Sequence, residues 1–319
     1  MEKDSRLVKT MRLTLEACQH YGLQEYSCKH SRKDFKQSQL VACLVFKQEV
    51  GKRYRETIEF LELMPCVSKA IGLNKTPHYT TLQKALARFT AKRLEEIIEY
   101  VALLAVYGNT VNFKSVWKAQ DASFDGSGYF LTNASYYYQQ RIKKKVKAKH
   151  FLHSVIGVLT QFLLVFCTKQ KRGPASDTTA FVPLLNRQPF PLQNALADKG
   201  FDSEENLRCA YEKNFQPLIP VREGKSTPSR TKLRKRMLKR FNTDLRIKEL
   251  YGKRALNETV FSVVKRVYNS TLHGKTVSMQ KKELQTRYLA YNIRRAIQLL
   301  SSILRTFLQS TTVSLCKRL

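Results

Sequence analysis

Apolar residues recur every three to four positions through the first hundred residues of the chain. The pattern runs through QSQLVACLVFKQEVGKRYRETIEFLELM (37–64) and again through TTLQKALARFTAKRLEEIIEYVALLAVYG (80–108). This spacing is typical of helices that bury one face. Gly72 and Pro77 mark a turn between the two segments. The N-terminal part of the chain is therefore predicted to be all-helical.

Two helices joined by a short turn have the outline of a helix-turn-helix. Thr80 and Thr81 are the expected N-caps of the second helix. This helix carries Lys84, Arg88 and Lys92, which we predict to contact a DNA backbone. Any basic helical hairpin has the same pattern, so helix packing without DNA binding is the alternative at this stage.

From about residue 115 the hydrophobic pattern changes to short apolar runs that alternate with helical segments. One strand is predicted to end at Asp125, with a turn at 126–128, and a short strand is predicted in NALADKGF (194–201). Strands that alternate with helices form a sheet with helices on its faces, so an α/β domain is predicted. The other predicted strands are 149–158, 161–169 and 215–222. The predicted helices are 180–186, capped by Ser176 or Asp177, 202–214, capped by Asp202 or Ser203, and the amphipathic segment 282–308, as one helix or two.

The charge balance of the chain points to a polyanionic partner. It has 57 Lys and Arg residues against 25 Asp and Glu residues, a formal net charge of +32. Nucleic acid is the simplest such partner, because its phosphates are neutralised by basic side chains. A membrane surface is disfavoured, since the basic residues spread over the whole chain and do not flank an apolar anchor.

Two basic runs concentrate this charge, RIKKKVKAK (141–149) and GKSTPSRTKLRKRMLKR (224–240). Three consecutive tyrosines lie shortly before the first run. Aromatic rings beside cations favour tracking of a DNA strand, so Lys143, Lys144 and Lys145 are predicted DNA contacts. A solvated segment without a partner is the alternative for either run.

Several classes of protein are disfavoured by the remaining patterns. The most apolar run, 151–167, is shorter than the ~20 residues of a spanning helix. The N-terminus has no apolar signal core, so a cytoplasmic protein is expected. Seven cysteines form no C-x-x-C pair, which favours free thiols over a zinc site.

One segment, YGKRALNETVFSVVK (251–265), places a single acid among cations. On a helix, four of its polar side chains would share a stripe about 60° wide. These residues are Tyr251, Arg254, Glu258 and Lys265, and the apolar residues of the opposite arc are Leu256, Val260, Phe261, Val263, Val264, Val267 and Tyr268. The apolar arc is suited to docking on a core. A solvated face with a weak ion pair between Arg254 and Glu258 is the alternative.

Three carboxylates, Asp125, Asp198 and Glu258, are predicted to lie where strand ends and helix termini meet. Carboxylates gathered in a basic protein repel one another unless cations bind between them, and their hard oxygen atoms suit Mg²⁺ or Mn²⁺. Two such ions about 4 Å apart support in-line displacement at a phosphodiester. Asp121 and Asp202 are close in sequence to the first two acids, so spacing alone leaves the choice of acids open.

These segments resemble the DDE transposases of bacterial and archaeal insertion sequences. One branch of that family has the signature Tyr, two residues, Arg, three residues, Glu, six residues, Lys, which this chain matches from Tyr251 to Lys265. ADKGFD (197–202) is similar to the segment around the family's second Asp, and SFDGSGYF (123–130) to the segment around its first. The resemblance extends over about residues 30–300.

The resemblance implies an RNase H-like catalytic core, an α/β fold with a central mixed sheet flanked by helices. It implies a helix-turn-helix-like domain before this core and helices after it. Asp125, Asp198 and Glu258 are implied to be the catalytic residues and the ligands of Mg²⁺ or Mn²⁺, as two ions. The residues implied to contact DNA near the cut are Tyr251, Arg254 and Lys265.

The resemblance further implies a transposase that binds double-stranded DNA at the terminal repeats of its element, cuts it and joins it to target DNA. A homodimer on DNA, in the nucleoid of a prokaryotic cell, is the expected assembly. The expected division is a helical DNA-binding domain at 1–110, a catalytic domain at 111–275 and a C-terminal helical segment at 276–319. A catalytically inactive DNA-binding derivative and a related DNA endonuclease are the alternatives, because one site serves both hydrolysis and strand transfer.

Overall fold

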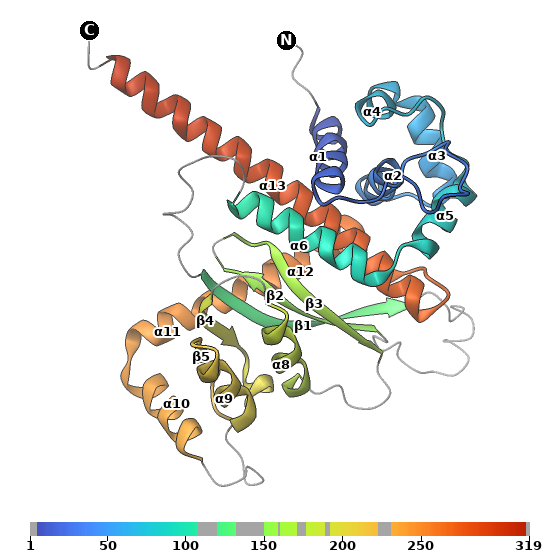
Figure 1. The fold of residues 1–319 in the computed structure, drawn as a ribbon. Helices are drawn as coiled ribbons and strands as arrows, with labels where there is room; N and C mark the ends of the chain where they lie inside the picture. Colours follow the sequence, from blue (N-terminus) through green and yellow to red (C-terminus); the bar gives the residue numbers. More distant parts are fainter. Residues whose placement is uncertain are drawn as a thin grey trace, which may run out of the picture. The chain divides into compact units, whose positions relative to one another are not determined.

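The computed structural model describes residues 5–107, 120–131, 150–158, 160–170, 177–188, 192–222 and 231–316 (Figure 1). The chain divides into two compact units. One unit comprises residues 1–109 together with 285–319, and the other comprises residues 110–284. The two units are described separately below.

The described strands of the second unit form one mixed sheet in the order β3-β2-β1-β4-β5 (Figure 1). The short β6 pairs with β1. The pairs β1–β2 and β2–β3 are antiparallel, whereas β4 and β6 run parallel to β1 and β5 runs parallel to β4. This mixed order confirms the α/β class and the RNase H-like arrangement expected from the sequence. The strand bounds are β1 Gln120–Leu131, β2 His150–Gly157, β3 Leu163–Gln170, β4 Leu192–Ala197, β5 Gln216–Leu218 and β6 Thr271–Leu272.

The first strand is longer than predicted. The expected turn at 126–128 lies inside β1, which continues to Leu131 because β2 pairs with it as far as the Tyr129–His150 register pair. Pairing with the parallel strand β4, by contrast, ends at Phe124 opposite Ala197. Asp125 therefore marks the end of the parallel pairing and not the end of the strand.

Helices pack on this sheet through apolar side chains. Helix α12 packs against β1, and α8 packs against β2 and β3. The rings of Phe124, Phe181 and Phe201 are fully buried and join β1, α8 and the 3₁₀ turn after β4, with centroid distances of 4.7 and 6.2 Å. The helix bounds are α8 Thr178–Asn186, α9 Glu204–Glu212, α10 Lys232–Thr243, α11 Leu245–Gly252 and α12 Leu256–Tyr268, and the 3₁₀ turns are Lys199–Phe201 and Lys253–Ala255.

The N-caps of α8 and α9, for which the sequence offered two candidates each, differ in their hydrogen bonding. Ser203 caps α9, because its Oγ accepts a hydrogen bond from the backbone N–H of Asn206 at 3.1 Å. Asp177 stands at the N-cap position of α8 but forms no side-chain capping bond. The carboxylate of Asp177 is therefore available for another contact.

The described part of the first unit is all-helical, as predicted, but its two long predicted helices are interrupted. Gly51, with a φ of 65°, ends α2, and Phe89 and Thr90 separate α5 from α6. Thr90 Oγ1 accepts a hydrogen bond from the backbone N–H of Arg93 at 3.2 Å. The prediction of Thr80 and Thr81 as caps was wrong, because α5 already begins at Tyr79. The bounds are α1 Arg6–His20, α2 Gln37–Val50, α3 Tyr54–Leu63, α4 Pro65–Ala70, α5 Tyr79–Arg88 and α6 Ala91–Tyr107.

One long helix, α13 (Val277–Cys316), contains the segment 282–308, for which one or two amphipathic helices were predicted. Gln285, on α13, donates a hydrogen bond to the carbonyl of Ala91 at 2.8 Å, and Gln48 of α2 donates to Thr286 at 2.9 Å. These polar contacts are buried among apolar side chains, so they fix how α13 docks within the first unit.

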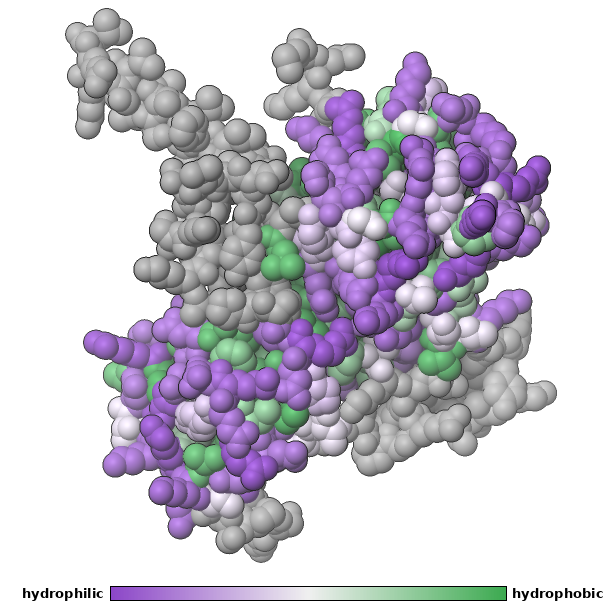
Figure 2. All heavy atoms as spheres, viewed as in Figure 1, coloured by the Kyte–Doolittle hydropathy of each residue, from purple (hydrophilic) through white to green (hydrophobic). Residues whose placement is uncertain are grey.

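The described surface in Figure 2 is mostly hydrophilic, in keeping with the charge of the chain. Large apolar side chains are exposed at only a few of the described positions. One of them is Val267, 36% exposed, which corrects its assignment to the apolar arc of its helix. Within the residues that the structure describes, no helix is both long and apolar enough to cross a membrane. The exposed positions are Leu63, Phe130, Leu245, Val267 and Val277.

Candidate active site

Asp125 projects from the middle of β1 into a half-buried site. Its side chain is 16% exposed, and its Oδ1 accepts a hydrogen bond from the backbone N–H of Gly126 at 2.7 Å. Burial raises the pKa of Asp125 to about 6. The bond from Gly126 and the charge of Arg254 oppose this shift, whereas the charges of Asp198 and Glu258 add to it. Asp125 therefore lies within electrostatic reach of both other predicted acids.

Asp198 directly follows β4, and register places it beside Asp125. Phe124 and Ala197 are partners on the parallel strands β1 and β4, so the next residue on each strand is an acid. Asp198 Oδ1 accepts a hydrogen bond from the backbone N–H of Gly200 at 2.7 Å, which closes the 3₁₀ turn. The two acids thus come from neighbouring parallel strands at the point where their pairing ends.

Arg254 joins the first acid to the third. Its Nη1 lies 3.5 Å from Asp125 Oδ2, and its Nη2 lies 3.3 Å from Glu258 Oε1. Glu258 is 65% exposed, while the Arg254 side chain is only 21% exposed. The alternative of a weak ion pair on a solvated face therefore fits the exposure of Glu258. It does not account for Arg254, which also contacts Asp125 on the sheet.

The predicted stripe of four side chains is divided among three elements. Tyr251 lies in the last turn of α11, Arg254 lies in a 3₁₀ turn, and Glu258 and Lys265 lie on α12. The prediction of a single continuous helix was therefore wrong. Burial raises the pKa of Tyr251, whose ring packs edge-on against Phe241 with a centroid distance of 5.2 Å. The break in the helix lets Arg254 reach Asp125.

Lys265 contacts the sheet through an aromatic ring. Its Nζ lies 5.3 Å from the ring centroid of Tyr129, a fully buried residue of β1. Burial lowers the pKa of Lys265. Such a cation–π contact holds the end of α12 against β1 and places the ammonium group two turns beyond Glu258.

Two polar residues that the sequence did not single out anchor this region to β1. Asn257 Nδ2 donates a hydrogen bond to Ser123 Oγ at 2.7 Å, and both residues are buried. Ser123 Oγ in turn lies 3.4 Å from the carbonyl oxygen of Arg254. Their place beside Asp125 and Glu258 in the sequence is the one signal that could have identified them.

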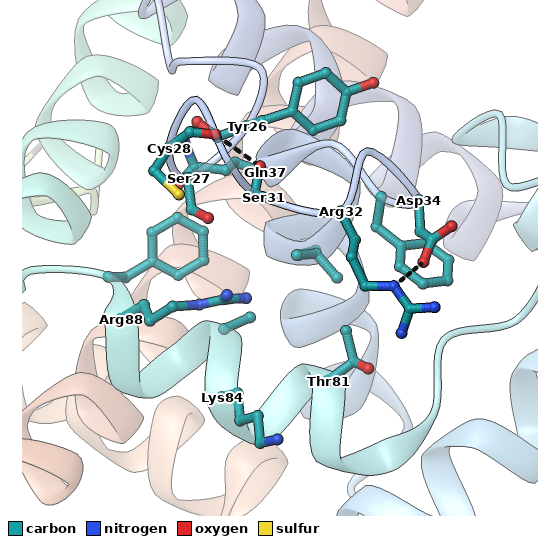
Figure 3. A pocket seen from close by; sticks show the side chains of 14 residues that line it. Tyr26, Ser27, Cys28, Ser31, Arg32, Asp34, Gln37, Thr81, Lys84 and Arg88 are labelled. Carbon is teal, nitrogen blue, oxygen red and sulfur yellow. Dashed lines mark hydrogen bonds and ion pairs between the residues drawn. The ribbon is translucent and has the colours of Figure 1, made fainter.

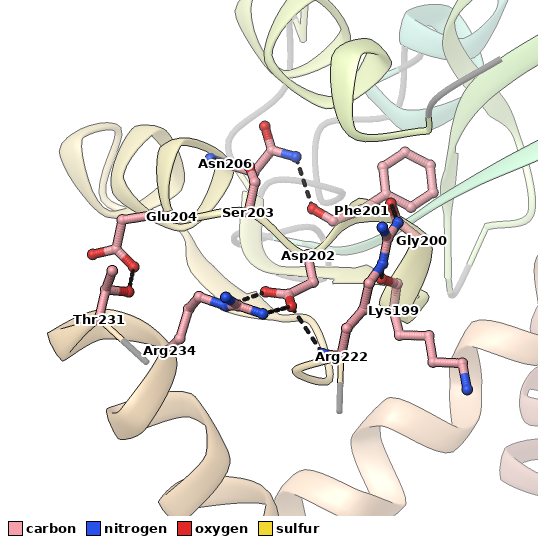
Figure 4. A network of polar contacts seen from close by, with 10 residues as sticks. All are labelled: Lys199, Gly200, Phe201, Asp202, Ser203, Glu204, Asn206, Arg222, Thr231 and Arg234. Atoms are coloured by element: carbon pink, nitrogen blue, oxygen red, sulfur yellow. Dashed lines mark hydrogen bonds and ion pairs between the residues drawn. The ribbon is translucent and has the colours of Figure 1, made fainter. Parts of the chain in front are cut away.

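A buried ion pair holds the turn after Asp198 (Figure 4). Asp202 Oδ2 lies 2.5 Å from Arg234 Nη2 and accepts the backbone N–H of Arg222 at 2.8 Å. The Arg222 side chain donates to the carbonyl oxygen of Lys199 at 2.6 Å and to that of Gly200. The basic run that contains Arg234 is therefore not a simple solvated segment, because α10 docks on the turn through this buried arginine.

These contacts decide among the neighbouring acids. The carboxylate of Asp202 is fully buried against Arg234, so it has no face open to a ligand. Asp121 lies near the start of β1, where its Oδ1 accepts a hydrogen bond from Asn194 at 2.7 Å. Asp125 and Asp198 remain as the carboxylates that converge.

The donor chemistry of the site suits a hard divalent cation, although no closed set of ligands is formed. Among the residues that the structure describes, no group of three or more His, Cys, Asp and Glu side chains is arranged to hold a metal ion. The charges of Asp198 and Glu258 both raise the pKa of Asp125, and a cation placed between these groups would oppose that effect. Arg254 now supplies the positive charge between Asp125 and Glu258.

The other predicted DNA contacts belong to the first unit or lie outside the described residues. Lys84 and Arg88 lie on α5 and line a pocket of about 290 Å³ opposite the loop 26–35 (Figure 3). Lys92 lies on α6, and its Nζ is 3.8 Å from Oε1 of Glu96. Hydroxyl groups of Ser27, Ser31 and Thr81 also line the pocket. Lys143, Lys144 and Lys145 lie outside the described residues.

The sequence matches the profile of a known protein family. Residues 116–293 match the profile of a family described as "Transposase DDE domain". The matched segment is more than half of the 319-residue chain and contains Asp125, Asp198 and Glu258. No curated protein matches the sequence.

Proposed function

Because the chain belongs to the family of transposases with a DDE domain, we propose that it binds the ends of a mobile DNA element, cuts them and joins them to target DNA. The observation that carries this proposal is that Arg254 pairs with both Asp125 and Glu258, while strand register sets Asp198 beside Asp125. Asp125 and Asp198 follow paired residues on parallel strands, and Glu258 is linked to Asp125 through Arg254.

In this proposal Asp125, Asp198 and Glu258 hold two Mg²⁺ or Mn²⁺ ions. The chemistry that bound ions would supply there is activation of a water or a 3′-hydroxyl and stabilisation of the leaving oxygen during in-line displacement. Asp125 and Asp198 are suited to this task, since the two neighbouring parallel strands that carry or precede them fix their separation. The side chain of Glu258 is 65% exposed, so rotation about its own bonds can bring its carboxylate toward the other two.

Basic side chains of the same site bind the substrate. Arg254 carries a planar guanidinium with several donors, which suits a phosphate oxygen as well as a carboxylate. Tyr251 and Lys265 lie on either side of it in sequence and present a ring and an ammonium group. We propose that these three residues contact the DNA strand next to the cut.

The first unit is proposed to bind the terminal repeats through α5. Lys84 and Arg88 are its candidate contacts, and Lys92, Lys143, Lys144 and Lys145 stay predictions. The division at 1–110, 111–275 and 276–319 likewise stays a prediction of separate roles. A homodimer on the DNA of the nucleoid is proposed because two element ends must be held together during transposition.

Cleavage of a labelled duplex that carries the element's own end tests the proposal. We expect nicking at the end with Mg²⁺ or Mn²⁺ and none with EDTA. Asp125→Ala, Asp198→Ala and Glu258→Ala are expected to abolish it while DNA binding survives. Asp121→Asn is the matched control, since this acid of β1 bonds to Asn194 outside the site.

Each contrary result has a distinct meaning. Binding without cutting by the wild type would indicate an inactive DNA-binding derivative. Cutting that persists in one alanine variant would show that its carboxylate was wrongly chosen. Hydrolysis without joining to a target duplex would favour the endonuclease alternative.

A further inference from the structure

His153 and Asp177 form a contact that has no part in the site described so far. His153 Nε2 lies 2.9 Å from Asp177 Oδ1, and the two side chains are 1% and 39% exposed. His153 comes from β2, and Asp177 stands immediately before α8. Burial alone lowers the pKa of His153, but the bond to Asp177 and the proximity of Cys167 raise it to about 9. The contact is thus a charged pair at neutral pH.

The histidine ring lies over the residue that follows Asp125. Gly126 and His153 are partners in the antiparallel register of β1 and β2. A Cβ on Gly126 would lie 3.0 Å from Cδ2 and 3.2 Å from Nε2 of His153. Glycine leaves room for this close approach of a ring to the backbone, which a larger residue would block.

The carboxylate of Asp177 lies over the second glycine of the site. A Cβ on Gly200 would lie 2.8 Å from Asp177 Oδ2 and 2.7 Å from Asp198 Oδ1. The carboxylates of Asp177 and Asp198 therefore share the space beside one glycine. The backbone N–H of Gly200 also binds Asp198, so a shift of Gly200 would move that acid.

The ring of His153 also packs against the residue after Gly200. Its centroid lies 6.5 Å from that of Phe201 in an edge-on arrangement, and Phe201 is fully buried. The pair of His153 and Asp177 thus contacts both backbone segments that carry predicted metal ligands, one after Asp125 and one after Asp198.

We propose that His153 and Asp177 are a positioning pair, which fills the space left by Gly126 and Gly200 and so sets the separation of Asp125 and Asp198. The inference rests on the proposed function, since that separation matters for binding a divalent ion. Groups that orient metal ligands from outside the coordination sphere commonly change metal affinity 10–100-fold. The two glycines and the pair depend on one another, because the missing side chains of Gly126 and Gly200 leave the space that His153 and Asp177 occupy.

Binding of Mn²⁺ to the full chain, without DNA, tests the inference. Free Mn²⁺ is measured by electron paramagnetic resonance for the wild type, His153→Leu, Asp177→Ala and the double variant. We expect each single variant to raise the dissociation constant about tenfold or more. The double variant should bind no more weakly than the weaker single variant, because the two residues act as one unit. Asp121→Asn is the matched control and should bind like the wild type.

A conservative variant separates positioning from loss of folding. His153→Gln keeps a donor that can reach Asp177, and we expect it to keep Mn²⁺ affinity closer to the wild type than His153→Leu does. Thermal unfolding followed by circular dichroism shows which variants are folded. If His153→Leu does not fold, His153→Gln and Asp177→Asn carry the comparison, with the larger loss expected for Asp177→Asn.

The outcomes separate this inference from the proposed function. A wild type that binds no Mn²⁺ contradicts the proposed metal site, and the positioning pair with it. A wild type that binds Mn²⁺ while His153→Leu and Asp177→Ala bind equally well contradicts the positioning pair alone. Losses that add in the double variant also overturn it, since His153 and Asp177 would then act separately.

Discussion

Arg234 binds both carboxylate oxygens of Asp202, with Nε 3.1 Å from Oδ1 and Nη2 2.5 Å from Oδ2. The two side chains are only 8% and 0% exposed. This bidentate pair connects α10 to the turn that follows Asp198. A basic helix and a predicted catalytic acid are thus parts of one packed structure.

Arg234→Ala is expected to lower the free energy of unfolding by about 3–5 kcal/mol. Removing one partner of a buried pair leaves an uncompensated charge, which costs more than the pair contributed. Urea unfolding followed by circular dichroism measures the effect. Lys235, the next residue on α10, is exposed, so Lys235→Ala is the control. It should change the free energy of unfolding by less than about 0.5 kcal/mol. Equal effects of the two variants would show that the pair is energetically unimportant.

Arg254→Gln is expected to tighten Mn²⁺ binding in the absence of DNA and to weaken DNA cleavage. Arg254 now neutralises Asp125 and Glu258, so without it a bound cation becomes their main counter-charge. Cleavage falls because a donor for the DNA phosphate is lost. Mn²⁺ titration and the labelled-duplex assay measure the two effects. Weaker Mn²⁺ binding by the variant would instead mean that Arg254 orients the carboxylates.

Stability is expected to fall as pH rises from about 6.5 to about 9. The pKa of His153 is raised to about 9 in the folded chain. The charged histidine therefore stabilises the fold fully below its unfolded pKa of about 6.5, and this contribution is lost as the pH rises through the folded pKa. Asp177 and Cys167 are the titratable groups that face His153. Urea unfolding at several pH values, compared between the wild type and His153→Gln, isolates this contribution. An identical pH dependence in the two proteins would contradict it.

Lys84→Ala and Arg88→Ala are each expected to reduce the salt dependence of DNA binding. Loss of one phosphate contact lowers the slope of log affinity against log salt by about one, similarly for all DNA sequences. Fluorescence anisotropy at several salt concentrations measures the slope. The slope of Lys92→Ala is compared with those of the α5 variants, because Lys92 lies on α6 and its charge is paired with Glu96. Lys52→Ala, at the break between α2 and α3, is the control.

The sequence predicted the type of most main elements because hydrophobic period and turn residues are local signals. The α/β region, the helical first unit and the helical segment near the end of the chain were predictable in this way. The mixed order of the sheet was implied by the family resemblance, and helix α10 was not predicted, because its segment has the composition of a basic run. Interruptions were harder to predict, since the amphipathic pattern continues across the breaks at Gly51 and at Phe89. A helix breaks there because a glycine with positive φ or a new cap satisfies the backbone locally.

The extent of β1 shows the limit of local signals. Glycines at 126 and 128 suggest a turn, but pairing with β2 extends the strand to Leu131. The same glycine that reads as a turn in sequence leaves room for the ring of His153 in space. Cross-strand contacts, which are distant in sequence, decided the conformation.

The sequence by itself determined that the chain is basic, that it has an α/β region, and that three acids with the spacing of a DDE transposase are present. Only the tertiary structure decided which acids converge. Asp202 forms a buried ion pair with Arg234, and Asp121 accepts a hydrogen bond from Asn194. The register of β1 with β4 brings Asp125 beside Asp198. The physical reason is that charge, period and motif are properties of neighbouring residues, whereas burial, ion pairing and strand register depend on residues far apart in the chain.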